Sequence, residues 1–320
     1  MSSIVHIGMH KTASSSLQAM WGAMDDVVLS KAFCLEISNR LISTIESGGQ
    51  KPFELPTDIP LFATSSNVAD PYRVYSAENL SNPNTSRFDR PVLEAFHKTA
   101  ADVFYKIAGE GAQVLLLVRS PESWLKSRYK QYVHKGGSFR FQRFLNSNSS
   151  ELAYLLSLDF LKYWEDQFGA KNVHILPYEM LAEDMDLFFD LLHNQLGLPK
   201  KEFSADPREN VSVAEDEAAF LRHAARYMRL FTDNASLGAG TAAQFRQNAI
   251  IVSDVLRTEI QKNPDGKIAR LARRIGKSEG ADVTWPQNIV AAIRDGMVPR
   301  LQEERDGFHG HIGTYLAAFQ

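Results

Sequence analysis

The segment at residues 4–20 constrains the fold more than any other part of the chain. A short apolar strand is predicted at 4–7, a hydroxyl-rich turn carrying Lys11 follows at 8–16, and a helical pattern begins at Leu17. A strand that leads through such a turn into a helix directs unpaired backbone N–H groups and the positive end of the helix dipole at one point. The segment therefore predicts a site for a phosphorylated or sulfated ligand.

Apolar runs elsewhere in the chain predict a parallel sheet. The run at 113–118 has no polar alternation after its first residue, which favours a central strand covered on both faces. Shorter runs lie at 73–76 and 173–176, and helical periodicity is present at 88–107 and 184–196. Strands that alternate with helices predict right-handed crossovers, so we expect a three-layer α/β fold with a central parallel sheet flanked by helices.

The character of the sequence changes near Pro199. The helical pattern before it ends at Gly197, which together with the proline is typical of a helix C-terminus. Helices of mixed polarity follow, with breaks at 238–240, 264–266 and 285–286. We expect residues 1–200 to form the α/β core and residues 201–320 to form a C-terminal helical extension packed on that core, within one structural domain overall.

Charge and composition argue against several classes of protein. The formal net charge of −3 disfavours a whole-molecule nucleic-acid binder. The single cysteine, Cys34, cannot form an intrachain disulfide, and its apolar context predicts an inert core thiol. No apolar stretch approaches the roughly 20 residues that span a bilayer, and the short segment before the first strand leaves no room for a signal peptide. We expect a cytoplasmic protein with no nucleic-acid partner and no membrane span.

A second candidate anion site follows the strand at 113–118. Arg119 comes directly after this strand, at the end where open α/β sheets bind their ligands, and Pro121 suits the first turn of a helix. Ser127 lies two turns into that helix, where its hydroxyl can share a phosphate with Arg119. Between residues 112 and 150, seven basic residues accompany one acidic residue in a chain that is net acidic. This pattern predicts an anion site at the strand end.

The turn at 8–16 does not match the Walker A pattern, because no glycine directly precedes Lys11. A nucleoside triphosphate site is therefore disfavoured. What remains is a lysine as a cationic donor, followed by the hydroxyl groups of Thr12 and of the serines at 14–16. Taken alone, this turn fits a serine-rich helix start with an exposed lysine better than it fits an anion site.

Together the two segments resemble the sulfotransferases that use 3′-phosphoadenosine-5′-phosphosulfate (PAPS), most closely the bacterial and carbohydrate-type members. Residues 7–18 resemble the 5′-phosphosulfate loop of that family, and residues 118–121 with Ser127 resemble its 3′-phosphate site. Three further stretches resemble family segments in the same order: 75–78, 164–181 and 210–212. The resemblance covers roughly the first two thirds of the chain and implies a P-loop-like fold. The Arg-Lys-Gly lid of some cytosolic members has no match here.

The resemblance also implies a role for each residue of the two motifs. Lys11 would stabilise the bridging oxygen as the leaving nucleotide gains charge, and Arg119 with Ser127 would hold the 3′-phosphate. The residues implied around the 5′ end are Gly8, Lys11, Thr12, Ala13, Ser14 and Ser15. Glu78 is the first candidate for the general base and His10 is the second. The resemblance also implies that the desulfated nucleotide PAP is the product and that the reaction requires no metal. His6, on the strand itself, is predicted to be structural.

Ala13 departs from the family pattern, which has glycine at this position and so permits a positive φ. Two alternatives therefore stay open: a P-loop small-molecule kinase that uses ATP with magnesium, and a non-catalytic nucleotide-binding relative. The expected acceptor is a hydroxyl group of a carbohydrate or a small metabolite, whose identity the sequence does not define. The sequence does not define an oligomeric state either.

Overall fold

The structure is a computed structural model that describes residues 3–9, 12, 14–48, 53, 55, 71–83, 90–198, 214–233, 239–276, 283–303 and 315. Its chain divides into two compact units. The first unit comprises Met1–Trp124, Asn148–Glu209 and Gln287–Gln320. The second unit comprises Leu125–Ser147 and Asn210–Pro286.

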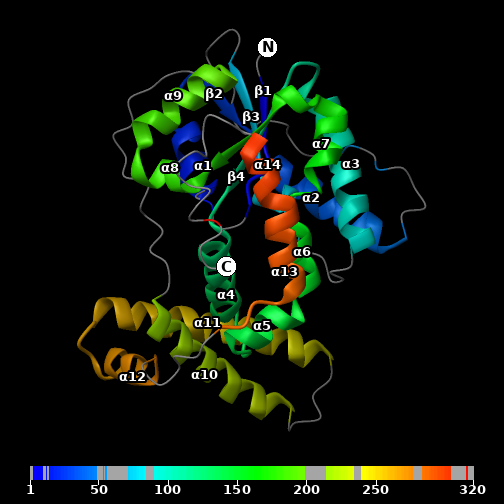
Figure 1. Cartoon of the computed structure of the whole chain (residues 1–320). Helices are drawn as coiled ribbons and strands as arrows, with labels where there is room; N and C mark the ends of the chain where they lie inside the picture. The colour runs from blue at the N-terminus through cyan, green and yellow to red at the C-terminus, as the bar shows by residue number, and fades with distance from the viewer. Residues whose placement is uncertain are drawn as a thin grey trace. The chain divides into compact units, whose positions relative to one another are not determined.

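A five-stranded parallel sheet forms the centre of the first unit (Figure 1). Its strands are β1 (Ser3–His6), β2 (Val27–Leu29), β3 (Tyr72–Ser76), β4 (Gln113–Val118) and β5 (Val173–Pro177). They lie in the order β2-β3-β1-β4-β5, and each neighbouring pair is parallel. The α/β fold with a central parallel sheet flanked by helices, predicted from the sequence, is confirmed.

Helices cover both faces of this sheet (Figure 1). One face is covered by α1 (Ser14–Gly22), α8 (Tyr178–Glu183) and α9 (Met185–Leu196). The other face is covered by α2 (Lys31–Glu46), α3 (Arg90–Ala108) and α7 (Leu161–Phe168). On the first face a continuous core joins Trp21 of α1, Leu115 of β4 and Phe188 of α9. Burial of such large apolar side chains is the main stabilising contribution to a layer of this kind.

Successive side chains of the buried strand β1 point to opposite faces of the sheet, so neighbouring residues contact different helices. Ile4 belongs to the core shared with α1, and the ring of His6, two residues on, lies edge-on to Trp21 at 5.2 Å. On the neighbouring strand β3, the side chain of Tyr75 points to the opposite face of the sheet, where the centre of its ring lies 6.5 Å from the centre of the Phe104 ring of α3. His6 is therefore a polar residue placed on the face that α1 covers.

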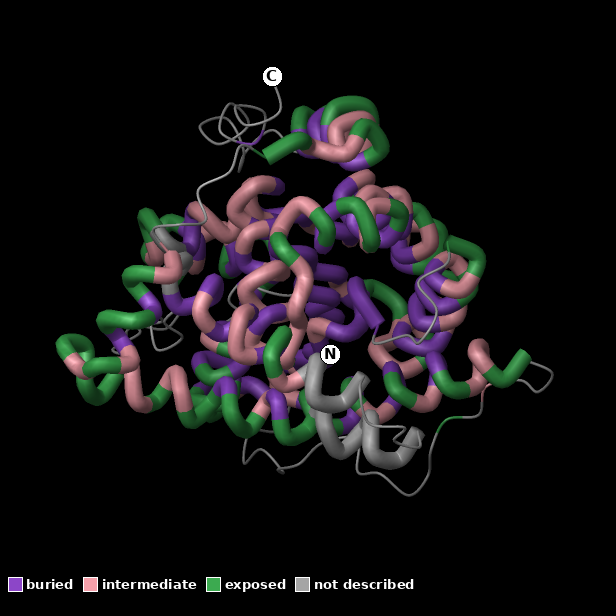
Figure 2. Tube along the Cα trace, turned by 90° about the horizontal axis from the view of Figure 1, so that it is seen from below, coloured by how far each residue is buried: buried purple, intermediate pink, exposed green. Residues whose placement is uncertain are grey.

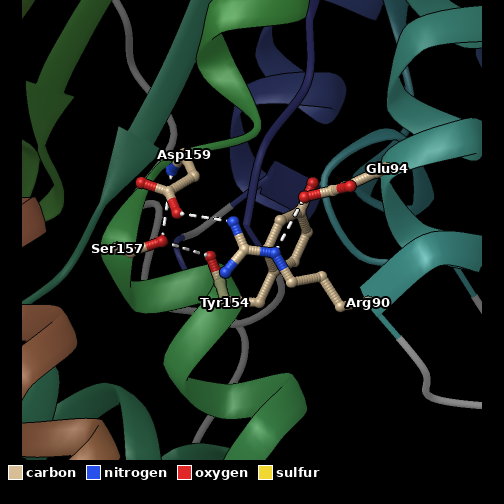
Figure 3. Close-up of polar contacts among 5 residues, drawn as sticks. All are labelled: Arg90, Glu94, Tyr154, Ser157 and Asp159. Atoms are coloured by element: carbon tan, nitrogen blue, oxygen red, sulfur yellow. Dashed lines mark hydrogen bonds and ion pairs between the residues drawn. The ribbon is translucent and has the colours of Figure 1, made fainter.

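The start of α3 is tied to the chain around α6 (Ser149–Ser157) by polar contacts, shown in Figure 3. Arg90 donates to Glu94 at 2.8 Å and to Asp159 at 3.3 Å, and its guanidinium lies over the Tyr154 ring at 5.7 Å. Ser157 donates to the carbonyl of Tyr154 at 2.9 Å. Such exposed ion pairs contribute little to stability, so their main effect is on the local geometry of these helices.

The last described helices pack within the first unit. These are α13 (Gln287–Ala291), η4 (Ala292–Met297) and α14 (Val298–Glu303). A Cβ on Gly296 would meet Ser157 of α6 at 2.9 Å, and Arg300 pairs with Glu165 of α7. The described helices at 287–303 therefore pack on the α/β unit.

Among the described residues of the second unit, the regular secondary structure consists of helices. It contains the larger part of α4 (Pro121–His134), which begins in the first unit, with α5 (Phe141–Ser147), α10 (Glu215–Asp233), α11 (Ala239–Lys262) and α12 (Lys267–Gly276). Val133 of α4 packs against Ala218 and Leu221 of α10. The breaks predicted at 264–266 and 285–286 both separate helices, while the turn predicted at 210–212 lies outside the described residues.

Buried and exposed positions alternate along the helices, as the colouring in Figure 2 shows. α9 is an example, since Phe188 and Leu192 are buried and Leu187 is exposed. Among the helices that are described, none is both long enough and apolar enough to cross a membrane.

Candidate functional site

The topology of the sheet places one edge of β1 and β4 at a switch point. The chain leaves β1 toward β2 on one side of the sheet and leaves β4 toward β5 on the opposite side. The two strands pair directly, with His6 opposite Leu115, so their carboxyl ends lie next to each other. Ligands of open α/β sheets bind at such points, outside the carboxyl ends of the strands. The two predicted anion motifs therefore begin at the same edge of the sheet.

Gly8 follows β1 and lies where the chain turns toward α1. Its carbonyl accepts a hydrogen bond of 2.9 Å from Ser81, which follows β3. A Cβ at this position would meet the Ser14 Oγ at 2.5 Å and the His6 Nε2 at 2.6 Å. Glycine is required here because two side chains approach the backbone closely, and not because of a positive φ.

The hydroxyl groups of the turn have different environments. Thr12 is fully buried and donates to the carbonyl of Met9 at 2.6 Å, so its proton holds the turn together. Ser14 is the first residue of α1, is 1% exposed, and its Oγ has no hydrogen-bond partner among the described residues. Ser15 is exposed. Ser14 thus combines a buried hydroxyl with the start of a helix, where backbone N–H groups have no intrahelical acceptor.

His10, Lys11 and Ala13 lie outside the described residues. Their predicted roles, as second base candidate, as cation at the bridging oxygen and as departure from the family glycine, stay predictions. The described residues on either side, Met9 and Thr12, are both buried.

A buried polar network beneath the turn was not predicted from the sequence, which assigned His6 only a structural role. The Nδ1 of His6 is hydrogen bonded to the Ser76 Oγ at 2.7 Å, and Gln18 of α1 donates to the same oxygen at 2.9 Å. Burial lowers the pKa of His6 to about 4, although the charge of Glu78 acts in the opposite direction, so the imidazole is neutral at pH 7. No signal in the sequence links these residues, because β1–β3 pairing brings them together.

Glu78, the first candidate for the base, begins the short 3-10 helix η1 (Glu78–Leu80) directly after β3. It is half-buried, and it lies close enough to His6 for its charge to raise the pKa of the imidazole. Since β3 pairs with β1, Glu78 leaves the sheet at the same edge as the turn at 8–14. This position fits a carboxylate that accepts a proton near an anion bound by that turn.

Arg119 follows β4 and stacks on an aromatic side chain from the next strand end. Its guanidinium carbon lies 4.8 Å from the centre of the Tyr178 ring, at the start of α8. Stacking on an aromatic face restricts the plane of the guanidinium group. The sequence analysis included Tyr178 in a family-like stretch but gave it no role.

Glu179, next to Tyr178, holds the start of α4. The backbone N–H of Ser120 donates to one carboxylate oxygen at 2.8 Å, and the hydroxyl of Tyr315 donates to the other at 2.7 Å. Burial, with the charge of Glu179 next in size, raises the pKa of Tyr315 above its ordinary value, so the phenol stays protonated as a donor. Tyr315 is 136 residues from Glu179 in sequence, and the sequence carried no signal for this contact.

Ser127 lies in α4 and is 8% exposed. The boundary between the two units falls within this helix, after Trp124. Its predicted participation in phosphate binding stays a prediction.

Metal ions in proteins are held by clusters of His, Cys, Asp and Glu side chains. In the part of the chain that the structure describes, no group of three or more such side chains is placed to hold a metal ion. The arrangement found here consists of hydroxyl, imidazole and guanidinium donors, which are suited to bind an anion.

Comparison with known proteins finds solved structures of similar fold. A solved sulfotransferase from Alicyclobacillus acidocaldarius is 17% identical, covers 73% of this chain and 92% of its own, and superimposes with a TM-score of 0.46. A likeness at this level does not indicate an activity. No family model matches the chain, and no curated protein matches it.

Proposed function

We propose that this protein is a sulfotransferase that transfers a sulfuryl group from PAPS to a hydroxyl group of a carbohydrate or small-metabolite acceptor. The observation that carries the proposal is the pairing of β1 with β4, which brings a buried, hydroxyl-bearing helix start and Arg119 to one edge of the sheet. Two anion sites at one edge fit a ligand with a phosphate at one end and a phosphosulfate at the other.

The reaction asks the protein for positioning and charge stabilisation, because the sulfuryl group passes directly from donor to acceptor. The bond between sulfur and the bridging oxygen breaks, its electron pair leaves with PAP, and a bond forms between sulfur and the acceptor oxygen. In the proposal Lys11 and the N–H groups of the turn at 8–14 stabilise the negative charge that develops on the leaving oxygen.

The acceptor hydroxyl loses its proton in this step, and Glu78 is proposed to receive it. A carboxylate with an ordinary pKa near 4.3 is ionised at neutral pH and therefore able to accept a proton. The position of Glu78 directly after β3 supports this role, since β3 neighbours β1. His10 is the alternative base.

The 3′-phosphate is assigned to Arg119, with Ser127 as a further donor. The stacking of Arg119 on Tyr178 supports this role, since a restricted guanidinium loses less freedom when it binds a phosphate. Gly8, Thr12, Ala13, Ser14 and Ser15 are proposed to surround the 5′ end. We further propose a cytoplasmic location and a reaction without metal.

Labelled sulfate transfer from PAPS to a panel of sugar and small-molecule hydroxyl acceptors tests the proposal. Transfer to at least one acceptor is expected. Glu78→Gln should then lower kcat by about 100- to 10,000-fold, the range for loss of a general base, with the KM for PAPS unchanged. Glu36→Gln, at an exposed carboxylate paired with Arg40, is the matched control and should leave kcat unaltered.

Three results would contradict parts of the proposal. Phosphoryl transfer from ATP with magnesium would identify a kinase instead. Tight binding of PAP without transfer to any acceptor would identify a non-catalytic nucleotide-binding protein. Full activity of Glu78→Gln combined with loss of activity in His10→Ala would move the base to His10.

A further inference from the structure

Three polar side chains are buried beneath the start of α1, beside the apolar core that includes Leu115 and Leu117. Gln18 of α1 donates to the Ser76 Oγ at 2.9 Å, and the same oxygen lies 2.7 Å from the Nδ1 of His6. All three residues are buried, and the side chains around them include Ile4 and Trp21. Buried polar groups of this kind persist only where hydrogen bonds satisfy them.

Counting donors and acceptors assigns the tautomer of His6. Gln18 supplies one proton to the Ser76 Oγ, and the hydroxyl proton of Ser76 then has the Nδ1 of His6 as its acceptor among the described contacts. If the Nδ1 carried the proton instead, the hydroxyl proton of Ser76 would be left buried without an acceptor. The neutral imidazole therefore carries its proton on Nε2.

The Nε2 of His6 faces the turn. It lies 2.6 Å from the point that a Cβ on Gly8 would occupy, and the Ser14 Oγ lies 2.5 Å from the same point. Neither the Nε2 nor the Ser14 Oγ has a hydrogen-bond partner among the described residues, although His6 is fully buried and Ser14 is 1% exposed. A buried donor and a buried hydroxyl thus lie beside each other at the N-terminus of α1, a helix of nine residues.

We infer that His6 is a positioning residue for the 5′ anion of the nucleotide, an inference that rests on the proposed function. When the anion is bound, the Nε2–H of His6 donates to the Ser14 Oγ, and the hydroxyl proton of Ser14 points at an anionic oxygen. Gln18, Ser76, His6 and Ser14 then form one chain in which every hydrogen bond is donated toward the anion. Hydrogen bonds aligned in one direction polarise and strengthen one another.

A neutral chain of this kind adds no fixed charge to the site. The part formed by Gln18, Ser76 and His6 is already present without a ligand, and it fixes the imidazole that orients the Ser14 hydroxyl once the anion is bound. It also accounts for Gly8, because any side chain at that position would separate His6 from Ser14.

Calorimetric titrations with adenosine 3′,5′-bisphosphate and with adenosine 3′-monophosphate test the inference. His6→Asn keeps a polar atom near the Nδ1 position and removes the Nε2 donor. It should weaken binding of the bisphosphate about 10-fold, which is the effect of losing one hydrogen bond that supports an anion contact. The affinity for the 3′-monophosphate should not change. His6→Gln, which places an N–H donor near the Nε2 position, should restore most of the affinity.

Two further variants complete the design. Ser14→Ala should match the loss in His6→Asn, and the double variant should add nothing further, because both changes break the same chain. His174→Asn is the matched control, since this half-buried histidine of β5 contacts Gln113 at 2.7 Å, and it should not change either affinity.

The outcomes separate this inference from the proposed function. If the wild-type protein binds neither nucleotide, the proposed function fails and the inference with it. If the wild-type protein binds the bisphosphate and His6→Asn binds it equally well, or loses both nucleotides alike, only the role of His6 is overturned. Nitrogen-15 NMR of the imidazole gives a test without any variant: the neutral Nε2–H tautomer at pH 7 is expected, and the Nδ1–H tautomer would overturn the chain.

Discussion

The two neighbouring strand ends are built from different chemistry. After β1, the described polar groups are neutral and buried: the hydroxyls of Thr12 and Ser14 and the imidazole of His6. At the end of β4 the groups are charged: the guanidinium of Arg119 stacks on Tyr178, and the carboxylate of Glu179 accepts a hydrogen bond from the backbone N–H of Ser120. Oriented donors beside the reacting bond suit a group whose charge changes during a reaction, whereas Arg119 on its aromatic support suits a phosphate that is only held.

This difference leads to a division of labour between the two ends. Changes after β1 should lower turnover as well as affinity for the 5′ end of the nucleotide, because the proposed bond breaking occurs there. Changes after β4 should act mainly on nucleotide affinity, because the 3′-phosphate is remote from the reacting bond. Each of the following experiments either sharpens this division or removes it.

The largest effect is expected from Lys11→Ala. Removal of a cation at the leaving oxygen should lower kcat by about 100- to 1,000-fold, as loss of a donor to a developing oxyanion does. Affinity for PAP should change much less. Lys31→Ala, at the exposed first residue of α2, is the control and should leave kcat unaltered. Unchanged turnover of Lys11→Ala would remove Lys11 from the mechanism.

Arg119→Ala should show the opposite pattern. Loss of a charge-assisted contact worth about 2 kcal/mol should raise the dissociation constant for PAP roughly 30-fold, with kcat at saturating PAPS nearly unchanged. Arg40→Ala, at an exposed arginine paired with Glu36, controls for loss of surface charge. Calorimetry and steady-state kinetics measure the two quantities, and a large fall in kcat with unaltered affinity would break the division.

Gly8→Ala tests the close packing under the turn. The added Cβ would lie within 2.6 Å of the His6 Nε2, so we expect a loss of about 1–3 kcal/mol in the free energy of unfolding, as for other overpacked sites. Gly22→Ala is the matched control, because its Cβ would meet only Leu29 at 3.9 Å. Urea unfolding measures the free energy of unfolding of both variants. Equal values for the two would show that the space around Gly8 accepts a Cβ without cost.

A smaller effect is expected from pH. Burial lowers the pKa of His6 to about 4 and that of His97 to about 3, while an unfolded histidine has a pKa near 6.5. Between these values the unfolded state binds more protons, so stability is full above about pH 6.5 and falls as the pH falls, by about 2 kcal/mol per imidazole at pH 5. Urea unfolding at pH 7 and 5 measures this.

His97→Phe separates the two contributions. His97 stacks on Phe160 with ring centres 4.6 Å apart, so phenylalanine is a suitable replacement. The variant should lose the share of the pH dependence that belongs to His97 and keep that of His6. A variant with the same pH dependence as the wild-type protein would show that folding does not lower the pKa of His97.

The sequence predicted those parts of the fold that depend on local patterns. The predicted strand at 113–118 coincides with β4, and α9 has the expected Gly197 at its end, with a left-handed φ of 66°. β2 was not predicted, because Val27–Leu29 has three residues, too few to show a period. Local patterns also placed the turn at 8–14 and Arg119 at strand ends.

The sequence could not predict contacts that tertiary structure alone creates. The His6–Ser76 hydrogen bond joins residues 70 positions apart, through the register of β1 with β3. The contact of Tyr315 with Glu179 depends on where the C-terminal segment returns to the sheet. In each case the sequence shows two polar side chains, but it does not show that they are in contact.

The central claim is that the ends of β1 and β4 bind opposite ends of one nucleotide. Calorimetry with adenosine 5′-monophosphate and adenosine 3′-monophosphate, on Ser14→Ala and Arg119→Ala, tests it most directly. A crossed pattern is expected, in which Ser14→Ala weakens only the 5′-monophosphate and Arg119→Ala weakens only the 3′-monophosphate. If both variants weaken both nucleotides alike, or neither variant weakens either, the two strand ends do not divide the ligand between them.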